Sequence, residues 1–213
     1  MKIKPQIKKD DTFLAKHQSF LSIPDKNIID VVFLGDSLTR RWEEVPDLWD
    51  KYFSKYHPLN LGIGGDHIEH VMWRVENGEL DHFEPQVIIL QIGTNNLPHN
   101  PSNRSIVTGI LDLITQIKQK NTAHIVVIGL YPRAPDDYIN DYQSRIEEVN
   151  HLLSKYSSKL QYHYEYFGDI FIMPDGSINK DLMPDGLHLN YDGYQIAGSM
   201  IAEIINNLIT SNT

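Results

Sequence analysis

The chain has 213 residues, 41 % of them hydrophobic and 22 % charged, which is ordinary for a globular protein and excludes disordered, collagen-like and coiled-coil chains. Its 19 Lys and Arg against 28 Asp and Glu give a formal net charge of −9, which disfavours binding to nucleic acid or to an anionic membrane surface. Cysteine is absent, so disulfides, thiolate nucleophiles and cysteine-ligated metals are excluded.

The N-terminal half of the chain alternates between helical and strand-like patterns. A short helix is predicted over 13–21 and a buried strand over 28–34, which reads IIDVVFL. The following segments predict a helix over 43–53, a short strand over 58–62 and a helix over 66–77 with Asp66 as its N-cap.

The alternation continues through the C-terminal half. The apolar segments predict strands over 87–92 and 125–130, with an amphipathic helix over 102–120 between them. A long helix is predicted over 136–157, a less apolar fifth strand over 161–166, and a closing helix over 191–208.

Strands that alternate with helices predict right-handed crossovers and a parallel sheet covered on both faces. The continuously apolar strands fit that burial better than an alternating, one-sided sheet. We therefore expect one α/β domain over 1–213 with a five-stranded parallel sheet, in which residues 1–26 form a helical extension packed on the domain. The charged N-terminal segment and the lack of an apolar run near ~18 residues predict a cytoplasmic protein without integral membrane association.

Small and polar residues follow the predicted strands, at the edge where ligands bind in such sheets. These segments are Gly35-Asp36-Ser37-Leu38, Gly62-Ile63-Gly64-Gly65-Asp66, Gly93-Thr94-Asn95-Asn96 and Tyr131-Pro132-Arg133, with Pro184-Asp185-Gly186-Leu187-His188 late in the chain. Such a collection is typical of an active-site rim.

The chemistry of these residues points to acyl transfer. The Ser37 hydroxyl needs a base to act as a nucleophile, and His188 lies three residues after Asp185, which can fix the imidazole tautomer. Gly65 has no Cβ and can bring its backbone N–H close to a substrate. The Asn95 amide suits a developing oxyanion, where one donor is worth about 3–4 kcal/mol. Together these residues predict a hydrolase of acyl esters.

Four of these segments resemble the signature blocks of the SGNH, or GDSL-type, hydrolases, in that family's order: GDSL at 35–38, the glycine block at 62–66, GTNN at 93–96 and DGLH at 185–188. The resemblance implies a flavodoxin-like three-layer sandwich, with Ser37, Asp185 and His188 as the catalytic triad. It also implies an oxyanion hole formed by the Ser37 and Gly65 amides and the Asn95 side chain. No cofactor or metal is implied.

Residues 60–80 (NLGIGGDHIEHVMWRVENGEL) and the GLYPR of 129–133 resemble the catalytic subunits of intracellular platelet-activating-factor acetylhydrolase. Short acyl esters, acetyl above all, of a lipid or another small molecule are the implied substrates, and a homodimer is the implied assembly. Residues 39–42 (TRRW) match the wider family instead. The candidate substrate contacts are Asp36, Leu38, Asn96, Arg133 and Leu187.

Other interpretations of the site compete with this one. Glu79 and His82 have the same spacing as Asp185 and His188, but they lie at the amino end of the third predicted strand, the wrong end of the sheet. The cluster of His67, His70 and His82 matches no known metal spacing and is interpreted as exposed helix histidines. Tight-turn packing is the expected role of Gly62 and Gly64. Core packing is the expected role of Trp73, and loop or interface contacts with carboxylates are expected for Arg74.

Two alternative functions remain open at this stage. A carbohydrate O-deacetylase or a lysophospholipase would use the same machinery, and Trp42, Trp73 and Tyr131 could stack on a sugar. A non-catalytic binding or scaffolding protein is the third alternative, against which the complete set of Ser37, Asp185 and His188 argues.

Overall fold

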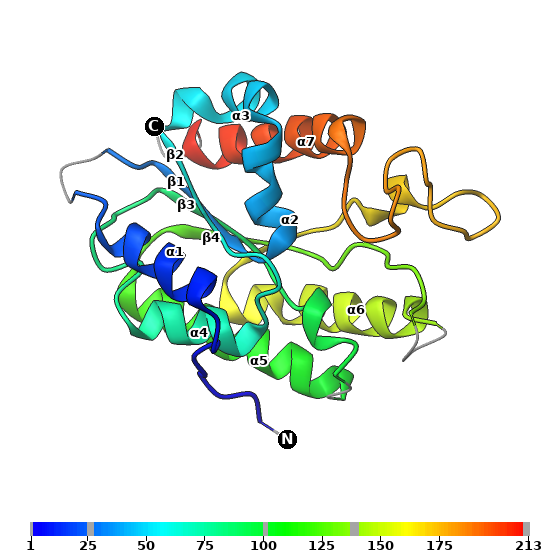
Figure 1. Ribbon diagram of the computed structural model, residues 1–213, viewed down its shortest axis with the longest axis horizontal. Coiled ribbons are helices and arrows are strands. Elements are labelled where there is room, and N and C mark those ends of the chain that lie inside the picture. The colour runs from blue at the N-terminus through cyan, green and yellow to red at the C-terminus, as the bar shows by residue number, and fades with distance from the viewer. Residues whose placement is uncertain (1, 25–27, 100–101, 137–140, 211–213) are drawn as a thin grey trace.

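Five parallel strands form one sheet at the centre of the computed structural model, which describes residues 2–24, 28–99, 102–136 and 141–210 (Figure 1). The strands are β1 (Val31–Gly35), β2 (Pro58–Gly62), β3 (Val87–Gln91), β4 (His124–Ile128) and β5 (His163–Glu165). They lie in the order β2-β1-β3-β4-β5, and every neighbouring pair is parallel. This is the flavodoxin-like order, so the predicted fold class is confirmed.

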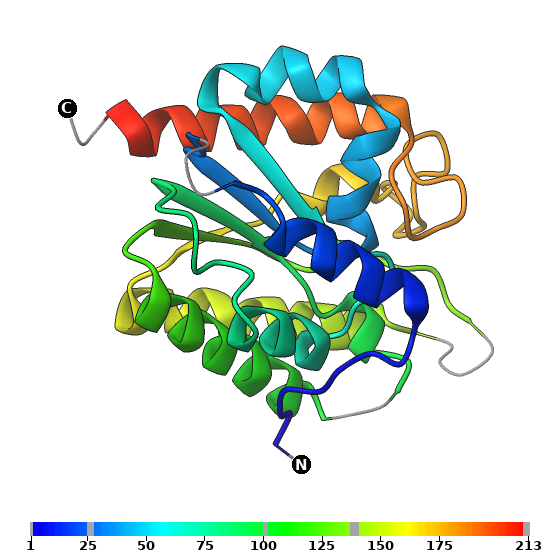
Figure 2. The same ribbon diagram turned by 60° about the vertical axis from the view of Figure 1, so that its left-hand side comes forward.

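Helices cover both faces of the sheet (Figure 2). One layer contains α1 (Asp11–Leu21), α4 (Ile68–Glu76), α5 (Asn103–Lys120) and α6 (Gln143–Leu160), and the other contains α2 (Ser37–Arg40), α3 (Pro46–Phe53) and α7 (Tyr191–Thr210). Alternate residues of each central strand face opposite layers. In β1, Val32 and Leu34 pack with the first layer, and Val31 and Phe33 pack with the second. This two-sided burial explains why the strands are continuously apolar.

The N-terminal segment packs against the first layer of helices. The Gln6 amide donates a 3.0 Å hydrogen bond to the carbonyl of Glu69, and Ile3 and Ile7 pack against the core. Asp10 then caps α1 by accepting a 2.8 Å hydrogen bond from the Thr12 amide. The interpretation of 1–213 as one domain stays a prediction.

Two predicted helices differ from the observed ones in their boundaries. The helix expected over 43–53 is divided into a 3-10 turn (Arg41–Glu44) and α3, because Pro46 disfavours helical backbone at Val45, whose φ and ψ are −132° and 58°. The long helix expected from 136 begins at Gln143 as α6, and part of that prediction, 137–140, lies outside the described residues. Asp136 is held in the preceding loop by Arg133 and Tyr142.

The strands predicted over 125–130 and 161–166 are shorter in the structure, as β4 and β5, and further differences lie near the ends of β1 and β2. Residues 28–30 precede β1 instead of belonging to it, and α2 was not predicted. Asp36 begins α2 as its N-cap by accepting a 3.0 Å hydrogen bond from the Leu38 amide, which is a local signal that the sequence carries. Asp66 is not an N-cap, since His67 occupies that position before α4.

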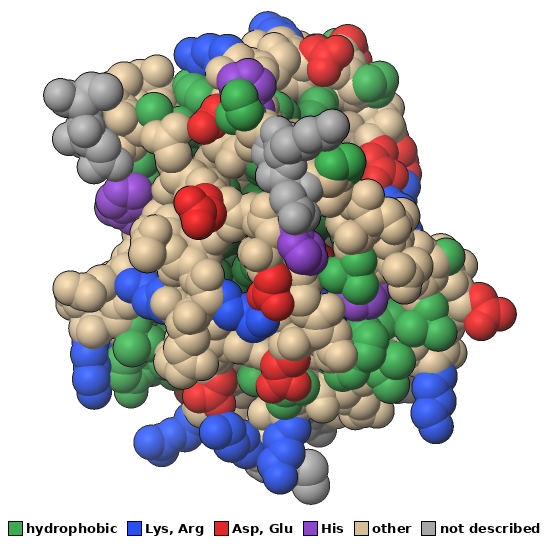
Figure 3. All heavy atoms as spheres, turned by 90° about the vertical axis from the view of Figure 1, so that its left-hand side faces the viewer, with side chains coloured by type: hydrophobic (Ala, Val, Ile, Leu, Met, Phe, Trp, Pro, Cys, Tyr) green, Lys and Arg blue, Asp and Glu red, His purple; other side chains and the backbone are tan. Residues whose placement is uncertain are grey.

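Charged side chains of both signs occur on the face shown in Figure 3, which lies at the left of Figure 1. Asp and Glu side chains are scattered over it, and Lys and Arg side chains gather along its lower edge. Within the described part of the chain, no helix has the length and apolar character needed to cross a bilayer.

Gly62 and Gly64 differ in what a side chain would meet. A Cβ at Gly62 would lie 2.3 Å from the Arg40 backbone nitrogen of α2, whereas a Cβ at Gly64 would have nothing within 4 Å. The packing role expected for both glycines therefore applies to Gly62 only. Gly62 lets α2, and with it Ser37, lie directly on the end of β2.

We predict that Gly62→Ala lowers the free energy of unfolding by about 1–3 kcal/mol or more, because the clash is with backbone that cannot rotate away. Urea denaturation followed by circular dichroism measures the change. Gly64→Ala is the matched control and should be neutral or stabilising by about 0.4–1 kcal/mol. Equal destabilisation of the two variants would contradict this account of Gly62.

Candidate active site

Ser37 is the first residue of α2, and only Asp36 separates it from the end of β1 at Gly35. The buried strand and the Asp36 cap both precede Ser37 and together fix the start of α2. Residues at the start of a helix have backbone N–H groups without partners inside the helix. The Ser37 amide is such a group, so the residue can supply both a hydroxyl and a hydrogen-bond donor.

A continuous chain of hydrogen bonds joins Ser37, His188 and Asp185. Ser37 Oγ lies 2.9 Å from His188 Nε2, and His188 Nδ1 lies 2.7 Å from Asp185 Oδ2. An ionised carboxylate can only accept, so Nδ1 carries the proton and the Nε2 lone pair faces the serine hydroxyl. This arrangement can remove the proton of Ser37 as the hydroxyl attacks a carbonyl.

The electrostatics of Asp185 suit this role. Burial alone would raise its pKa, but the amide and imidazole of His188 and the Leu187 amide outweigh it and lower the pKa to about 2. Gly186, at φ +76°, turns the loop, and its carbonyl accepts a 2.8 Å hydrogen bond from the Ala134 amide. The loop is thereby held against the segment that follows β4.

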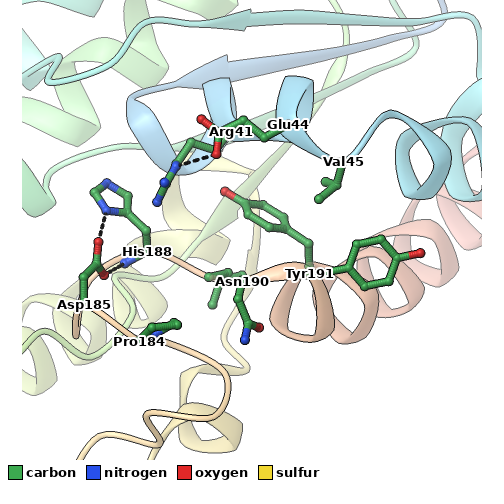
Figure 4. A pocket seen from close by; sticks show the side chains of 10 residues that line it. Arg41, Glu44, Val45, Pro184, Asp185, His188, Asn190 and Tyr191 are labelled. Carbon is green, nitrogen blue, oxygen red and sulfur yellow. Dashed lines mark hydrogen bonds and ion pairs between the residues drawn. The ribbon is translucent and has the colours of Figure 1, made fainter.

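A pocket of about 390 Å³ lies beside His188 and Asp185, between the 3-10 turn after α2 and the start of α7 (Figure 4). Arg41 and Glu44 form its upper wall in that view and are joined by a 2.9 Å ion pair. Tyr191 closes it at the start of α7. Tyr194 of the same helix also lines the pocket. The pocket therefore combines aromatic and charged walls next to the imidazole.

Three candidate oxyanion donors follow neighbouring strands. Ser37 follows β1, Gly65 follows β2 and Asn95 follows β3, and these strands are adjacent in the sheet. Gly65 has φ +70°, a backbone conformation that glycine adopts at little cost. The Asn95 side chain donates a 2.9 Å hydrogen bond to the carbonyl of Asp66, which orients its amide.

Arg74 lies fully buried below these turns and holds them together. Its guanidinium donates to Asp66 Oδ2 at 3.0 Å, to the Leu61 carbonyl at 3.0 Å and to the Gly35 carbonyl at 3.2 Å, and it also pairs with Glu79. The expected loop contacts of Arg74 with carboxylates are thus present. Glu79, the carboxylate of the rival pair, is directed to Arg74 and to His17, whose Nδ1 is 2.9 Å away.

Two buried carboxyl groups flank the site. Burial raises the pKa of Asp36 to about 7, and the charge of Asp66 adds to the rise. Burial also raises the pKa of Asp66 to about 6, although Arg74 and Lys8 oppose it. Among the residues that the structure describes, neither Asp36 Oδ2 nor Asp66 Oδ1 has a hydrogen-bond partner. Each carboxyl is therefore more easily protonated than in water.

The candidate substrate contacts lie in different environments. Asn96 is buried, donates to Glu69 at 2.8 Å and accepts from the Ile68 amide at 3.0 Å, so its amide is occupied by loop contacts. Leu38 is buried in the second layer and Leu187 is half-buried. Arg133 donates to the Thr94 carbonyl at 3.1 Å and pairs with Asp136 at 3.3 Å.

His67, Glu69 and His70 come together within the described residues, with candidate ligand atoms within 4.8 Å of one another. They are half-buried, not exposed as expected, and His82 is not in this group. His67 Nδ1 lies 3.2 Å from Glu69, and His70 Nδ1 accepts from the His67 amide at 3.0 Å. Because these nitrogens are occupied, the group is described best as a hydrogen-bond network.

Two contacts at the site were not predicted. Lys8 donates a 2.8 Å hydrogen bond to the Gly64 carbonyl, and no sequence pattern links the two residues. The Tyr194 hydroxyl donates to the Leu38 carbonyl at 2.8 Å and so ties α7 to the helix that begins at Ser37.

Trp73, expected in the core, is half-buried and packs against Phe13 and His17 of α1.

Residues 33–196 match the GDSL-like lipase/acylhydrolase family. The chain is 36 % identical over 190 residues to platelet-activating factor acetylhydrolase IB subunit alpha1 of Rattus norvegicus, covering 87 % of this chain and 78 % of that protein. It is 35 % identical over 206 residues to subunit alpha2 of Homo sapiens, covering 95 % and 87 %.

Solved structures of acylhydrolases have the same fold. A GDSL-like lipase of Bacteroides thetaiotaomicron superposes with a TM-score of 0.78 at 17 % identity, over 92 % of this chain and 97 % of that one. An acetyl xylan esterase superposes with a TM-score of 0.69 at 18 % identity, over 83 % and 99 %.

The raised pKa of Asp36 predicts how the free energy of unfolding changes with pH. Its pKa is near 3.8 in the unfolded chain and about 7 in the folded protein, so its stabilising contribution is complete below pH 3.8 and is lost as the pH rises through 7. The loss is up to about 4 kcal/mol, from three pKa units at 1.36 kcal/mol each. Asp36→Asn stays neutral, so we expect its stability relative to wild type to increase from pH 4 to pH 7 and to level off above pH 7.

Urea unfolding of both proteins at several pH values measures this difference. Asp50→Asn, which changes an exposed carboxylate of α3, is the control for the loss of one carboxylate and is measured at the same pH values. A flat difference for Asp36→Asn would show that the buried carboxyl ionises normally.

Proposed function

The chain belongs to the GDSL-like lipase/acylhydrolase family, and we propose that it cleaves short acyl esters, acetyl esters above all, through an acyl-enzyme on Ser37. As a member of this family the protein is a hydrolase of ester bonds. The single observation that carries the proposed mechanism is the hydrogen-bond chain from Ser37 Oγ through His188 to Asp185.

In the proposed mechanism, Ser37 Oγ attacks the ester carbonyl while His188 Nε2 accepts its proton. The carbonyl oxygen becomes an oxyanion, for which the Ser37 and Gly65 amides and the Asn95 side chain are the proposed donors. Asp185 stabilises the imidazolium. His188 then protonates the leaving alcohol, and water, activated by the same imidazole, releases the acid and restores Ser37.

Support for an acetyl substrate comes from the relatives. The two relatives at 35–36 % identity are subunits of platelet-activating factor acetylhydrolase IB, and each alignment covers most of this chain and most of the relative. The acetyl xylan esterase shares the fold at 18 % identity, which is too distant to favour a sugar ester. The homodimer and the cytoplasmic location stay predictions.

A chain-length series of p-nitrophenyl esters, from acetate to octanoate, tests the substrate class. We expect acetate to give the highest kcat/KM. Ser37→Ala should lose the activity by a factor of about 10⁴ or more, because the residual rate depends on binding and the oxyanion donors alone. Ser19→Ala, an exposed serine on α1, is the matched control and should act as wild type.

Other outcomes distinguish the alternatives. Preference for octanoate would favour a lipase-like substrate. If a fluorophosphonate probe labels Ser37→Ala as strongly as wild type, Ser37 is not the nucleophile. An inert wild-type protein that the probe leaves unlabelled would favour a non-catalytic role.

Asp185 gives a second prediction. Asp185→Asn removes the charge that holds the Nδ1 proton of His188, so kcat should fall by about 10²–10⁴-fold while folding is retained. The drop should be near the lower figure because the Asp185 side chain is 54 % exposed and water can replace part of its effect. Asp181→Asn, also exposed in the segment before this loop, should leave kcat within about twofold.

A further inference from the structure

The N-terminal segment 2–10 is anchored along the first helical layer. Besides the Gln6 bond to Glu69, Lys2 pairs with Asp112 of α5 at 3.2 Å. Ile3 fills the space next to Gly109. A Cβ added at Gly109 would lie 3.0 Å from Ile3 Cδ1. These contacts lead the chain from α5 across α4 to the glycine turn after β2.

Lys8 is the residue of this segment that reaches the glycine turn. Its Nζ donates to the Gly64 carbonyl at 2.8 Å and lies 3.3 Å from the position that a Cβ at Gly65 would occupy. Asp10 Oδ2 lies 3.6 Å away, and the unpartnered Asp66 Oδ1 lies 3.9 Å away. Two carboxylates therefore hold the ammonium over the turn.

The Gly64 carbonyl and the Gly65 N–H belong to the same peptide unit. This unit is planar and trans, so a donor that fixes the direction of the C=O also fixes the opposite direction of the N–H. A cation bound to the oxygen polarises the unit and makes its N–H a stronger donor. A glycine pair needs such a restraint more than other residues do, because its backbone is the least restricted.

We propose that Lys8 is a positioning residue that orients and strengthens the Gly65 amide as an oxyanion donor. The inference rests on the proposed function and adds the N-terminal segment to the active site. In this proposal Lys8 acts through the Gly64–Gly65 peptide and not by contact with the substrate. It therefore stabilises the oxyanion of the transition state and not the bound substrate.

The contacts of Asp66 provide a second route for the same effect. Its carbonyl accepts from the Asn95 side chain, and its carboxyl is buried between Arg74 and Lys8. His70 also lies 3.9 Å from this carboxyl, but burial lowers the pKa of His70 to about 4, so its ring is neutral near pH 7. Without the ammonium, Arg74 would therefore be the remaining cation beside this carboxyl among the described side chains. Lys8 thereby supports two of the three proposed donors.

Lys8→Met tests the proposal, because methionine keeps the length of the side chain and removes its charge and donors. We expect kcat for p-nitrophenyl acetate to fall about 10-fold with KM within twofold, since loss of a whole oxyanion donor costs about 10²–10³ in kcat. The rate of Ser37 phosphonylation should fall in parallel. Lys8→Arg should restore at least about a third of kcat, since arginine can donate to the same carbonyl.

Lys9→Met is the matched control, since Lys9 is the exposed neighbour in the same segment, and it should behave as wild type. Titration with a fluorophosphonate counts folded active sites, so kcat is compared per active molecule. An unchanged kcat in Lys8→Met overturns the proposal, and so does a raised KM with kcat unchanged, which would assign Lys8 to substrate binding. If Ser37→Ala retains full activity, the proposed function itself fails, whatever the result at Lys8.

Discussion

The buried guanidinium of Arg74 is the interaction on which the site depends. It binds the carbonyls of Gly35 and Leu61, which lie at the ends of β1 and β2, and it pairs with Asp66 in the turn between β2 and α4. Ser37 and Gly65 follow these carbonyls closely along the chain. A buried charge without its partner costs about 3–5 kcal/mol, so the strand ends and the turn are strongly held in this arrangement.

The same cation connects the site to the N-terminal region. Glu79 bridges Arg74 to His17 of α1, and Asp66 lies between Arg74 and Lys8. The first residues of the chain therefore complete a network of charges that begins at the end of β1, next to Ser37, the proposed nucleophile. This arrangement explains why the N-terminal segment lies across α4 instead of extending into solvent, and it makes the segment part of the support of the glycine turn.

Much of the site could be predicted because its residues lie in short segments at strand ends. Ser37, Asn95, Asp185 and His188 were found from residue type and spacing, and the structure joins Ser37, His188 and Asp185 by hydrogen bonds. Asp66 was interpreted as a helix cap because its position before a helical pattern is typical of one. In the structure its carboxylate turns inward and accepts a hydrogen bond from Arg74, whose buried N–H donors reach this position only in the folded chain.

The sequence by itself determined the alternation of strands and helices, the parallel sheet and the short list of candidate catalytic residues, because periodicity and turn chemistry act between neighbours. Tertiary structure alone decided that Lys8 contacts Gly64 and that Arg74 joins two strand ends. These features depend on charges and polar groups that are far apart in the chain. Their pairing is favourable only after packing has removed the water around them, and no local pattern records which distant partner will be there.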